Sequence, residues 1–125
     1  MHITQTAISL NVPDPGASGA FLVDHFGFEV EMEHDGMVSV RLPGAGCNVI
    51  YLRTGLESFK PKHRAGSAGD GLLLALVVDA LDADHRALAA AGVKVVTPPE
   101  TEPWGERFSQ YEDPNGIIVQ LVQWM

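Results

Sequence analysis

Hydrophobic and polar residues alternate along much of the chain, and this alternation predicts β-strands. In the first half it predicts strands over residues 3–12, 28–33, 37–42 and 48–53. Between the first two strands, Asp14 can cap a helix, Pro15 suits its first position, and Gly27 suits its end. The first half therefore has the predicted order β-α-β-β-β, with the helix over about residues 15–26.

The same order of elements returns in the second half. Strands are predicted over residues 71–79, 93–96, 106–112 and 117–124, with a loop over 98–105. Asp82 is predicted to cap a helix that runs to Ala91, and Gly92 is predicted to end it. Residues 54–70 show no periodicity and are rich in Gly, Ser and Lys, so they indicate a linker.

The two halves also match in their spacing. Val12 and Val77 lie 65 residues apart, as do Gly27 and Gly92, and the turn at 43–44 is repeated 71 residues later. A duplicated βαβββ unit explains both the order of the elements and their spacing.

Composition and charge narrow the class of protein. A chain of 125 residues with 46% hydrophobic and 19% charged residues has the composition of one globular domain. No apolar run approaches the roughly 18 residues that cross a bilayer, and no signal peptide is expected at the N-terminus. Cys47 is the single cysteine, so no internal disulfide can form and a cytoplasmic location is expected. The formal net charge of -8 and the lack of a basic stripe argue against nucleic acid as a partner.

Short motifs carry a resemblance to a known family. They are VPD at residues 12–14, FGF at 26–28, PWGER at 103–107, and DPNG at 113–116 followed by IIVQLVQ. In order and spacing they resemble the glyoxalase/bleomycin resistance protein/extradiol dioxygenase superfamily, also called vicinal oxygen chelate. The PWGER stretch is similar to bleomycin-resistance-type members and glyoxalase-like relatives.

The resemblance implies an α+β fold. Two tandem βαβββ modules would form curved mixed sheets around a cleft, with the helices on the convex side. Residues 1–125 would be a single glyoxalase-like domain, with module one over about 1–55, a linker over about 54–70 and module two over about 71–125. Members commonly dimerise, so a homodimer is expected.

The resemblance also implies where a metal would bind. Metal-dependent members use four ligands, usually His, Gln or Glu, and their positions fall here on Ala7, Tyr51, Leu73 and Gln120. Only the carboxamide of Gln120 is an ordinary donor, and it is a weak one. A shift of two residues, which keeps strand parity, brings in Gln5 but no carboxylate or imidazole. The five histidines lack ligand spacing and are expected to be solvated. We therefore expect no metal and no other cofactor.

Alternation then identifies the other side chains that would face the cleft. The set comprises Gln5, Ala7, Ser9, Met37, Ser39, Arg41, Val49, Tyr51, Arg53, Leu73, Ala75, Val77, Phe108, Gln110, Ile118, Gln120 and Val122. The opposite set is almost wholly aliphatic, as helix packing requires. We select the candidate ligand-binding residues from the cleft set and add Trp104, whose loop can cover the mouth. They are Gln5, Arg41, Tyr51, Arg53, Trp104, Phe108, Gln110 and Gln120.

Several of these residues have a structural alternative. Arg41 and Arg53 can pair with nearby glutamates, Tyr51 can belong to the core, and Trp104 can pack on a dimer partner or a sheet edge. An apolar cleft with a few fixed polar atoms is typical of a small-molecule site. We therefore expect a protein that binds or sequesters a small molecule, such as an antibiotic, without the usual metal. The alternatives are a lyase, isomerase or dioxygenase of the same superfamily with an unorthodox or metal-free site, and a structural role with the cleft filled. No catalytic residue is assigned, and the identity and charge of the ligand stay open.

Overall fold

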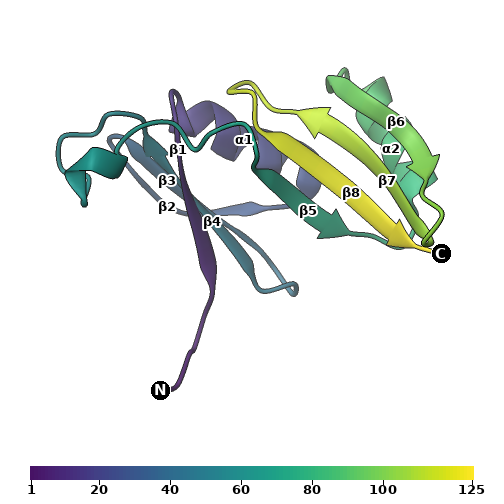
Figure 1. The fold of residues 1–125 in the computed structure, drawn as a ribbon, viewed down its shortest axis with the longest axis horizontal. Helices are drawn as coiled ribbons and strands as arrows, with labels where there is room; N and C mark the ends of the chain where they lie inside the picture. Colours follow the sequence, from purple (N-terminus) through teal and green to yellow (C-terminus); the bar gives the residue numbers. More distant parts are fainter. The chain divides into compact units, whose positions relative to one another are not determined.

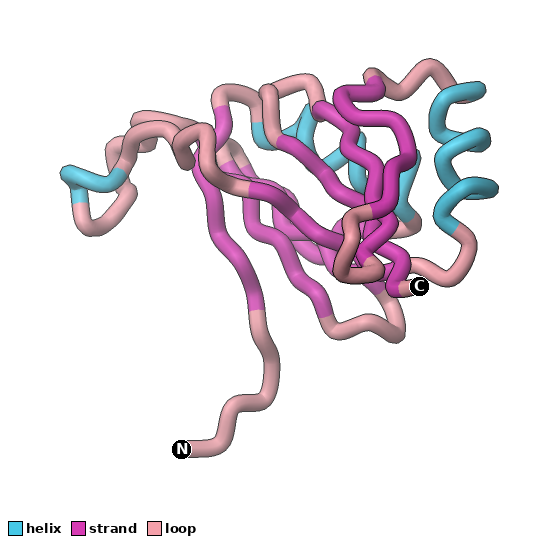
Figure 2. The backbone as a smooth tube through the Cα atoms, turned by 45° about the vertical axis from the view of Figure 1, so that its right-hand side comes forward, coloured by secondary structure: helices cyan, strands magenta, loops and turns pink.

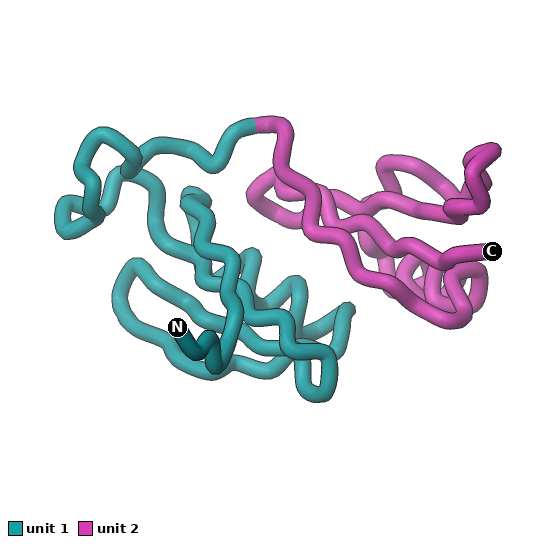
Figure 3. The backbone as a smooth tube through the Cα atoms, turned by 60° about the horizontal axis from the view of Figure 1, so that its bottom comes forward, with its two compact units in different colours: residues 1–69 teal, residues 70–125 magenta.

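A computed structural model describes residues 1–125 of the protein. The chain consists of two compact units, residues 1–69 and residues 70–125 (Figure 3). Each unit contains one α-helix and one four-stranded sheet, and the elements follow one another in the order βαβββ. The predicted α+β fold with two βαβββ modules is therefore confirmed. Neither α-helix has the length and apolar character that a transmembrane helix needs.

Unit 1 has its sheet strands in the order β1-β4-β3-β2 (Figure 1). Its elements are β1 (Ala7–Val12), α1 (Pro15–Phe26), β2 (Glu29–His34), β3 (Met37–Leu42) and β4 (Cys47–Arg53). β1 runs parallel to β4, and the other neighbours are antiparallel. The parallel pair is possible because the chain crosses over through α1 and the β2–β3 hairpin before it returns as β4.

The local signals in the sequence set the bounds of α1. The Asp14 side chain accepts a hydrogen bond from the backbone N–H of Ala17 at 3.2 Å, and Pro15 occupies the first turn. Gly27 ends the helix with φ 76°, a left-handed conformation that suits a residue without Cβ. α1, drawn in cyan in Figure 2, packs against one face of its sheet, chiefly on β3 and β4.

Gly19 allows this close packing of helix on sheet. A Cβ added to Gly19 would lie only 2.7 Å from Cγ1 of Val38 on β3, whereas one added to Gly16 would meet only Asp14 Oδ1 at 3.5 Å. Two substitutions in the same helix should therefore have opposite effects on stability.

We expect Gly19→Leu to lower the free energy of unfolding by roughly 1–3 kcal/mol, because the extra carbons must displace β3 or the helix. Gly16→Ala should raise it by about 0.5 kcal/mol, because alanine loses less backbone entropy than glycine. Urea denaturation of both variants measures the difference. A Gly19→Leu variant as stable as the wild type would show that α1 does not approach β3 this closely.

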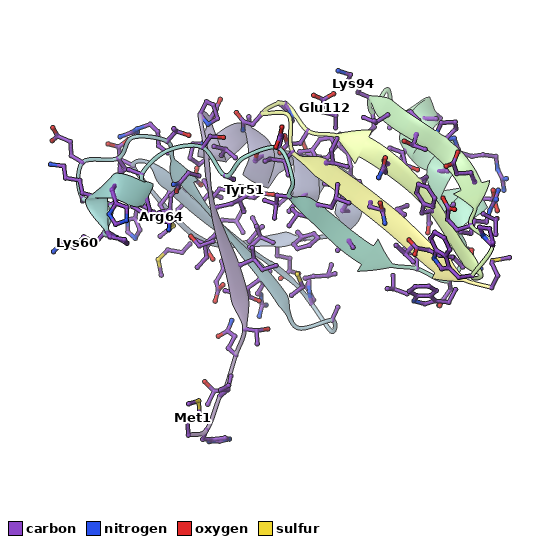
Figure 4. All side chains as sticks on the ribbon, viewed as in Figure 1. Met1, Tyr51, Lys60, Arg64, Lys94 and Glu112 are labelled. Atoms are coloured by element: carbon purple, nitrogen blue, oxygen red, sulfur yellow. The ribbon has the colours of Figure 1, made fainter.

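Unit 2 repeats the arrangement with the strand order β5-β8-β7-β6. Its elements are β5 (Leu73–Val77), α2 (Leu81–Ala90), β6 (Val95–Thr101), β7 (Glu106–Glu112) and β8 (Ile118–Trp124). β5 runs parallel to β8, and the others pair antiparallel. Lys94, just before β6, and Glu112, at the end of β7, form an ion pair of 2.6 Å at one corner of this unit (Figure 4).

The start of α2 differs from the prediction. Ala80 occupies the N-cap position, without a side-chain hydrogen bond, and the helix begins at Leu81. Asp82 therefore does not cap the helix. Its carboxylate instead accepts two hydrogen bonds from the guanidinium of Arg107, at 2.7 and 3.0 Å, and this hydrogen bonding lowers the pKa of Asp82. The side chain links the first turn of α2 to strand β7.

Strand β6 is longer than predicted and includes the first half of the segment that was predicted to be a loop. It runs to Thr101 through Pro98 and Pro99. Prolines lack the N–H that a central strand must donate, but β6 lies at the edge of the sheet, and its pairing with β7 shifts register twice, between Val95 and Thr97 and between Thr97 and Glu100. An edge strand with bulges tolerates proline.

All but the last residue of the predicted linker belongs to unit 1. It contains a short 3₁₀-helix, η1 (Lys62–Arg64). The side-chain amide of Asn11 on β1 donates hydrogen bonds to the carbonyl oxygens of Arg64, at 3.1 Å, and Gly66, at 2.8 Å. Figure 4 labels Lys60 and Arg64 in this segment. Asn11 thus holds the linker against the end of β1.

Candidate ligand-binding site

Strand register shows which side chains share a face of the unit 2 sheet. Ala75 of β5 pairs with Gln120 of β8, which pairs with Gln110 of β7, and Val122 pairs with both Val77 and Phe108. The predicted cleft residues of module two share one face. They are Leu73, Ala75, Val77, Phe108, Gln110, Ile118, Gln120 and Val122.

The other face of this sheet is covered by α2. Tyr111 and Val119 pair on that face and are buried, and His85 of α2 lies 2.9 Å from the hydroxyl of Tyr111. Ser109 also contacts this hydroxyl at 2.8 Å. Burial raises the pKa of Tyr111, so the phenol stays protonated and belongs to the core. His85 is therefore not the solvated residue that the sequence suggested. The face with Gln110 and Gln120 is the open one.

In unit 1 the residues selected on β1 and β3 share one face, but those selected on β4 lie on the other. Ser9 of β1 and Ser39 of β3 pair with Ile50 of β4, so these three residues share the face away from α1. Tyr51 instead pairs with Leu10 and Val38, and its exposed fraction is 0%. The predicted place of Tyr51 in the cleft is wrong, because the side chain lies in the core beneath α1.

The error is a shift of one residue in strand parity. β4 has apolar residues on both faces, so alternation along it does not show which face α1 covers. On the open face, Ile50 of β4 pairs with Ser9 of β1 in the way that Gln120 of β8 pairs with Ala75 of β5. One residue of difference reverses every side chain of a strand.

The two arginines form ion pairs, as the structural alternative proposed. Arg41 lies 3.2 Å from Glu29, and Arg53 lies 3.2 Å from Asp35 rather than from a glutamate. All four side chains are largely exposed, so each pair contributes little to stability. Arg53 follows Tyr51 on the α1 side of the strand and leaves the candidate site, whereas Arg41 remains on the open face.

The open face of unit 1 contains two adjoining hollows of about 630 and 330 Å³. Gln5, Glu31 and Asn48 line both, and Arg41 lines the larger. The smaller hollow has apolar walls that include Ala7, Met32, Met37 and Ile50. Hollows of this size match those that hold small organic molecules.

A carboxylate is fixed between these two hollows. Glu31 Oε2 accepts hydrogen bonds from Asn48 Nδ2 at 3.0 Å and from Ser39 Oγ at 3.3 Å. Asn48 and Ser39 are both buried. The pairing of β2 with β3 shifts register between Val30 and Met32, next to Glu31. The two donors hold the Glu31 carboxylate in place on the open face, where it can meet a polar or cationic group.

The open face of unit 2 carries a chain of hydrogen bonds, which we call the amide ladder. Thr97 Oγ1 donates to Gln110 Oε1 at 2.7 Å, and Gln110 Nε2 donates to Gln120 Oε1 at 2.8 Å. Gln120 Nε2 donates to Glu106 Oε1 at 3.4 Å, and Trp104 Nε1 donates to Glu106 Oε2 at 3.1 Å. The ladder thus crosses three strands and ends on a carboxylate.

Apolar and aromatic side chains surround the ladder. Phe108, Val77 and Ile118 lie on the same face, and Trp124 pairs with Glu106 at the end of the sheet. The indoles of Trp104 and Trp124 are 68% and 60% exposed, so their flat faces are available to another molecule. The surface combines an apolar wall with a short row of ordered amides.

Comparison with known proteins agrees with this architecture. The family model for the glyoxalase/bleomycin resistance protein/dioxygenase superfamily matches residues 2–121. The chain belongs to this superfamily. No curated protein matches it significantly.

Solved structures of superfamily relatives have the same fold. TnmS3, an antibiotic binding protein from Streptomyces sp. CB03234, is 27% identical with a TM-score of 0.73, and the alignment covers 99% of this chain and 100% of that one. A superfamily member from Sphaerobacter thermophilus DSM 20745 is 26% identical with a TM-score of 0.75 and 98% coverage of both chains. A superfamily protein from Nocardioides is 21% identical with a TM-score of 0.80, covering 100% of this chain and 85% of that one, which shows the fold alone.

The side chains at the superfamily's metal positions do not fit a divalent ion. Nowhere in the structure do three His, Cys, Asp or Glu side chains form a group that could hold a metal. Ala7 and Leu73 offer no donor side chain, Tyr51 lies in the core, and Ile50, its neighbour on the open face of β4, is aliphatic. Gln120 is already a member of the ladder. The expectation of a metal-free site stays a prediction that elemental analysis can test.

Sequence reasoning missed several residues on these faces. They are Glu31, Asn48, Thr97, Glu106 and Trp124. Strict alternation placed Glu31 on a solvated face, and no signal marked the irregular register beside it. Thr97 fell between the predicted strand over 93–96 and the predicted loop over 98–105, because the two prolines that follow it concealed the rest of the strand. Nothing in the sequence around Glu106 marks its contact with Gln120, because that residue lies 14 positions away on the neighbouring strand β8.

Proposed function

We propose that this superfamily member binds and sequesters a small organic molecule, such as an antibiotic, on the open faces of its two sheets, without a metal. The observation that carries the proposal is the pair of hollows in unit 1, where the fixed carboxylate of Glu31 lies among apolar walls. Such a site binds by apolar burial and selects by a few directed polar atoms. Gln5 and Arg41 in unit 1, and Phe108, Gln110, Gln120 and Trp104 in unit 2, are its proposed ligand-binding residues.

Similarity to TnmS3, an antibiotic binding protein, supports this class of function. The neighbours also include a lactoylglutathione lyase from Agrobacterium tumefaciens, but at 21% identity it is evidence for the fold only. The hydroxyl of Ser39 lies 3.3 Å from the Glu31 carboxylate, but Ser39 is buried, so this hydroxyl is poorly placed to attack a bound molecule. Binding is therefore the better supported role.

We propose that the protein works as a cytoplasmic homodimer. The outer strands β1 and β5 carry exposed apolar side chains, with Ile8 48% and Val77 67% exposed. A second copy would remove such side chains from water and cover strand edges that otherwise offer unpaired backbone groups.

Native mass spectrometry with elemental analysis of the same sample tests these proposals together. We expect the mass of a dimer and no stoichiometric divalent metal. We also expect either a co-purified small molecule or binding of some members of a panel of cationic, neutral and anionic aromatic antibiotics. Near-stoichiometric metal that is lost from a Gln5→Ala, Gln120→Ala double variant would instead support the enzyme alternative.

Filling the smaller hollow should weaken binding of whichever panel molecule occupies unit 1. Ile50→Trp places an indole in that hollow, whereas Val30→Trp, the control, adds the same bulk at a half-exposed position outside both hollows. We expect Ile50→Trp to weaken binding roughly tenfold or more, because the ligand and the indole need the same space. Isothermal titration calorimetry measures the affinity. Equal affinity in both variants would place the ligand elsewhere.

A further inference from the structure

The amide ladder of unit 2 has a direction, and Glu106 determines it. A glutamine side chain can turn its carbonyl oxygen and its NH₂ group end for end with almost no change in shape. A carboxylate can only accept hydrogen bonds, so Gln120 must point its Nε2 toward Glu106. With the opposite orientation, the carbonyl oxygen of Gln120 would face the negative carboxylate.

This orientation passes along the ladder. With Nε2 of Gln120 turned to Glu106, its Oε1 accepts from Gln110 Nε2. Gln110 Oε1 then accepts from the hydroxyl of Thr97. The indole N–H of Trp104 also donates to Glu106, so it cannot serve a ligand at the same time. Each member of the ladder is oriented by the next one, and the series ends at one carboxylate.

The direction decides which polar groups remain for a ligand. Both carbonyl oxygens accept a hydrogen bond within the ladder, whereas each NH₂ group uses only one of its two hydrogens. A part-buried N–H without a partner is costly, while a carbonyl that already accepts one bond is largely satisfied. The side-chain N–H groups of Gln110 and Gln120 are therefore the groups on this face that still require a hydrogen-bond acceptor.

The surroundings narrow the ligand further. The side chains near the ladder on the same face include the apolar or aromatic Phe108, Val77 and Trp124, and the further charged groups that register places there, Glu100 and Glu112, are negative. The negative charge of Glu106 disfavours a carboxylate or phosphate as the acceptor. The oxygen of a ketone, quinone or lactone accepts hydrogen bonds and carries no net charge, so it suits the two amides and is not repelled by Glu106. A flat apolar body fits the apolar wall.

We propose that Glu106 sets the polarity of the ladder so that unit 2 selects neutral, flat, largely apolar molecules that present a carbonyl-type oxygen to Gln110 and Gln120. The inference rests on the proposed function, since it names the class of molecule that one of its two faces takes. Glu106 acts here as a positioning residue, through the amides rather than by touching the ligand.

Three tricyclic probes of nearly the same shape test this selectivity. 9-Fluorenone offers a carbonyl acceptor, carbazole offers an N–H donor, and fluorene offers neither. In the wild-type protein we expect fluorenone to bind up to about tenfold more tightly than fluorene, as one net hydrogen bond allows, and carbazole to bind no better than fluorene. Titrations followed by intrinsic fluorescence or calorimetry give the three affinities.

The Glu106→Gln variant should remove the preference. A glutamine at this position can donate or accept, so the ladder can reverse and present either polarity. We expect the affinities for fluorenone and carbazole to approach one another within about twofold, as they would with no oriented hydrogen bond. Glu100→Gln is the control, because it makes the same charge change on the same face, opposite Phe108, at an exposed residue that makes none of the ladder's hydrogen bonds, and it should keep the wild-type preference.

Side-chain NH₂ signals in ¹H–¹⁵N spectra supply a readout that a purely structural role would not move. Fluorenone should shift the signals of Gln110 and Gln120 and leave that of Gln123 unchanged, because the Gln123 side chain bonds to the backbone of Asp79 and Leu81. Asparagine substitutions at positions 110 and 120 assign the signals. Fluorene should shift them less than fluorenone does.

The outcomes separate this inference from the proposed function. Equal binding of fluorenone and carbazole to the wild type, or an unchanged preference in Glu106→Gln, overturns the inference. Failure of all three probes to bind, when panel antibiotics or a co-purified molecule do bind, also overturns it and leaves the proposed function standing. If neither the probes nor any other small molecule binds, both the inference and the proposed function are wrong.

Discussion

Replacing Tyr51 by alanine is expected to lower the free energy of unfolding by roughly 3–5 kcal/mol, the usual loss for a fully buried aromatic side chain. Tyr51 is among the largest side chains with no exposed surface, and it pairs with Leu10 and Val38 in the core beneath α1. The surrounding sheet and helix cannot close the cavity completely. Chemical denaturation with urea measures the loss.

A milder substitution at position 51 tests whether Tyr51 belongs to the hydrophobic core or to the ligand-binding site. Tyr51→Phe keeps the ring, so it should cost no more than about 1 kcal/mol and should leave ligand affinity unchanged. Arg53→Ala, at an exposed ion pair two residues later, should change stability by less than about 0.5 kcal/mol. A Tyr51→Phe variant with full stability but weakened binding would return this residue to the ligand site, contrary to the structure.

Most of the fold could be predicted because its signals are local. Asp14 and Gly27 bound α1 through caps that involve residues only a few positions apart. The turn at 113–116 is likewise set by its own residues. The order of the elements in the second half repeats that of the first, so recognition of the duplication supported the prediction for both halves. Asp82 shows the limit of such signals, because its distant partner Arg107 competes with the cap.

Strand parity and polar networks could not be predicted in the same way. β4 is apolar on both faces, so nothing along the strand distinguishes Ile50 on the open face from Tyr51 in the core. The bulge beside Glu31 and the long edge strand β6 depend on pairing across the sheet. In module two the residues expected to share one face do share it, because polar Gln110 and Gln120 alternate with buried residues. Where one face is polar and the other apolar, alternation suffices.

Replacing Asp113 by alanine should be the second most damaging change, with a loss of roughly 2–4 kcal/mol, since two backbone N–H groups lose a charged acceptor. Asp113 is 5% exposed, and its Oδ1 accepts from the backbone N–H of Asn115 at 2.8 Å and of Ile117 at 2.9 Å. Both donors lie in the turn that connects β7 to β8. Without the carboxylate, the turn no longer fixes the register of the two strands that carry Gln110 and Gln120.

Two comparisons identify the cause of that loss. Asp113→Asn keeps an oxygen at the same position and should recover part of the stability, whereas Asp14→Ala removes a single exposed cap and should cost only about 1 kcal/mol. Ligand affinity of the fraction of Asp113→Ala that remains folded should equal that of the wild type, because Asp113 bonds to the turn and not to the open face. If the variant were stable but failed to bind, the DPNG motif would serve the ligand directly, and its role as a structural turn would have to be abandoned.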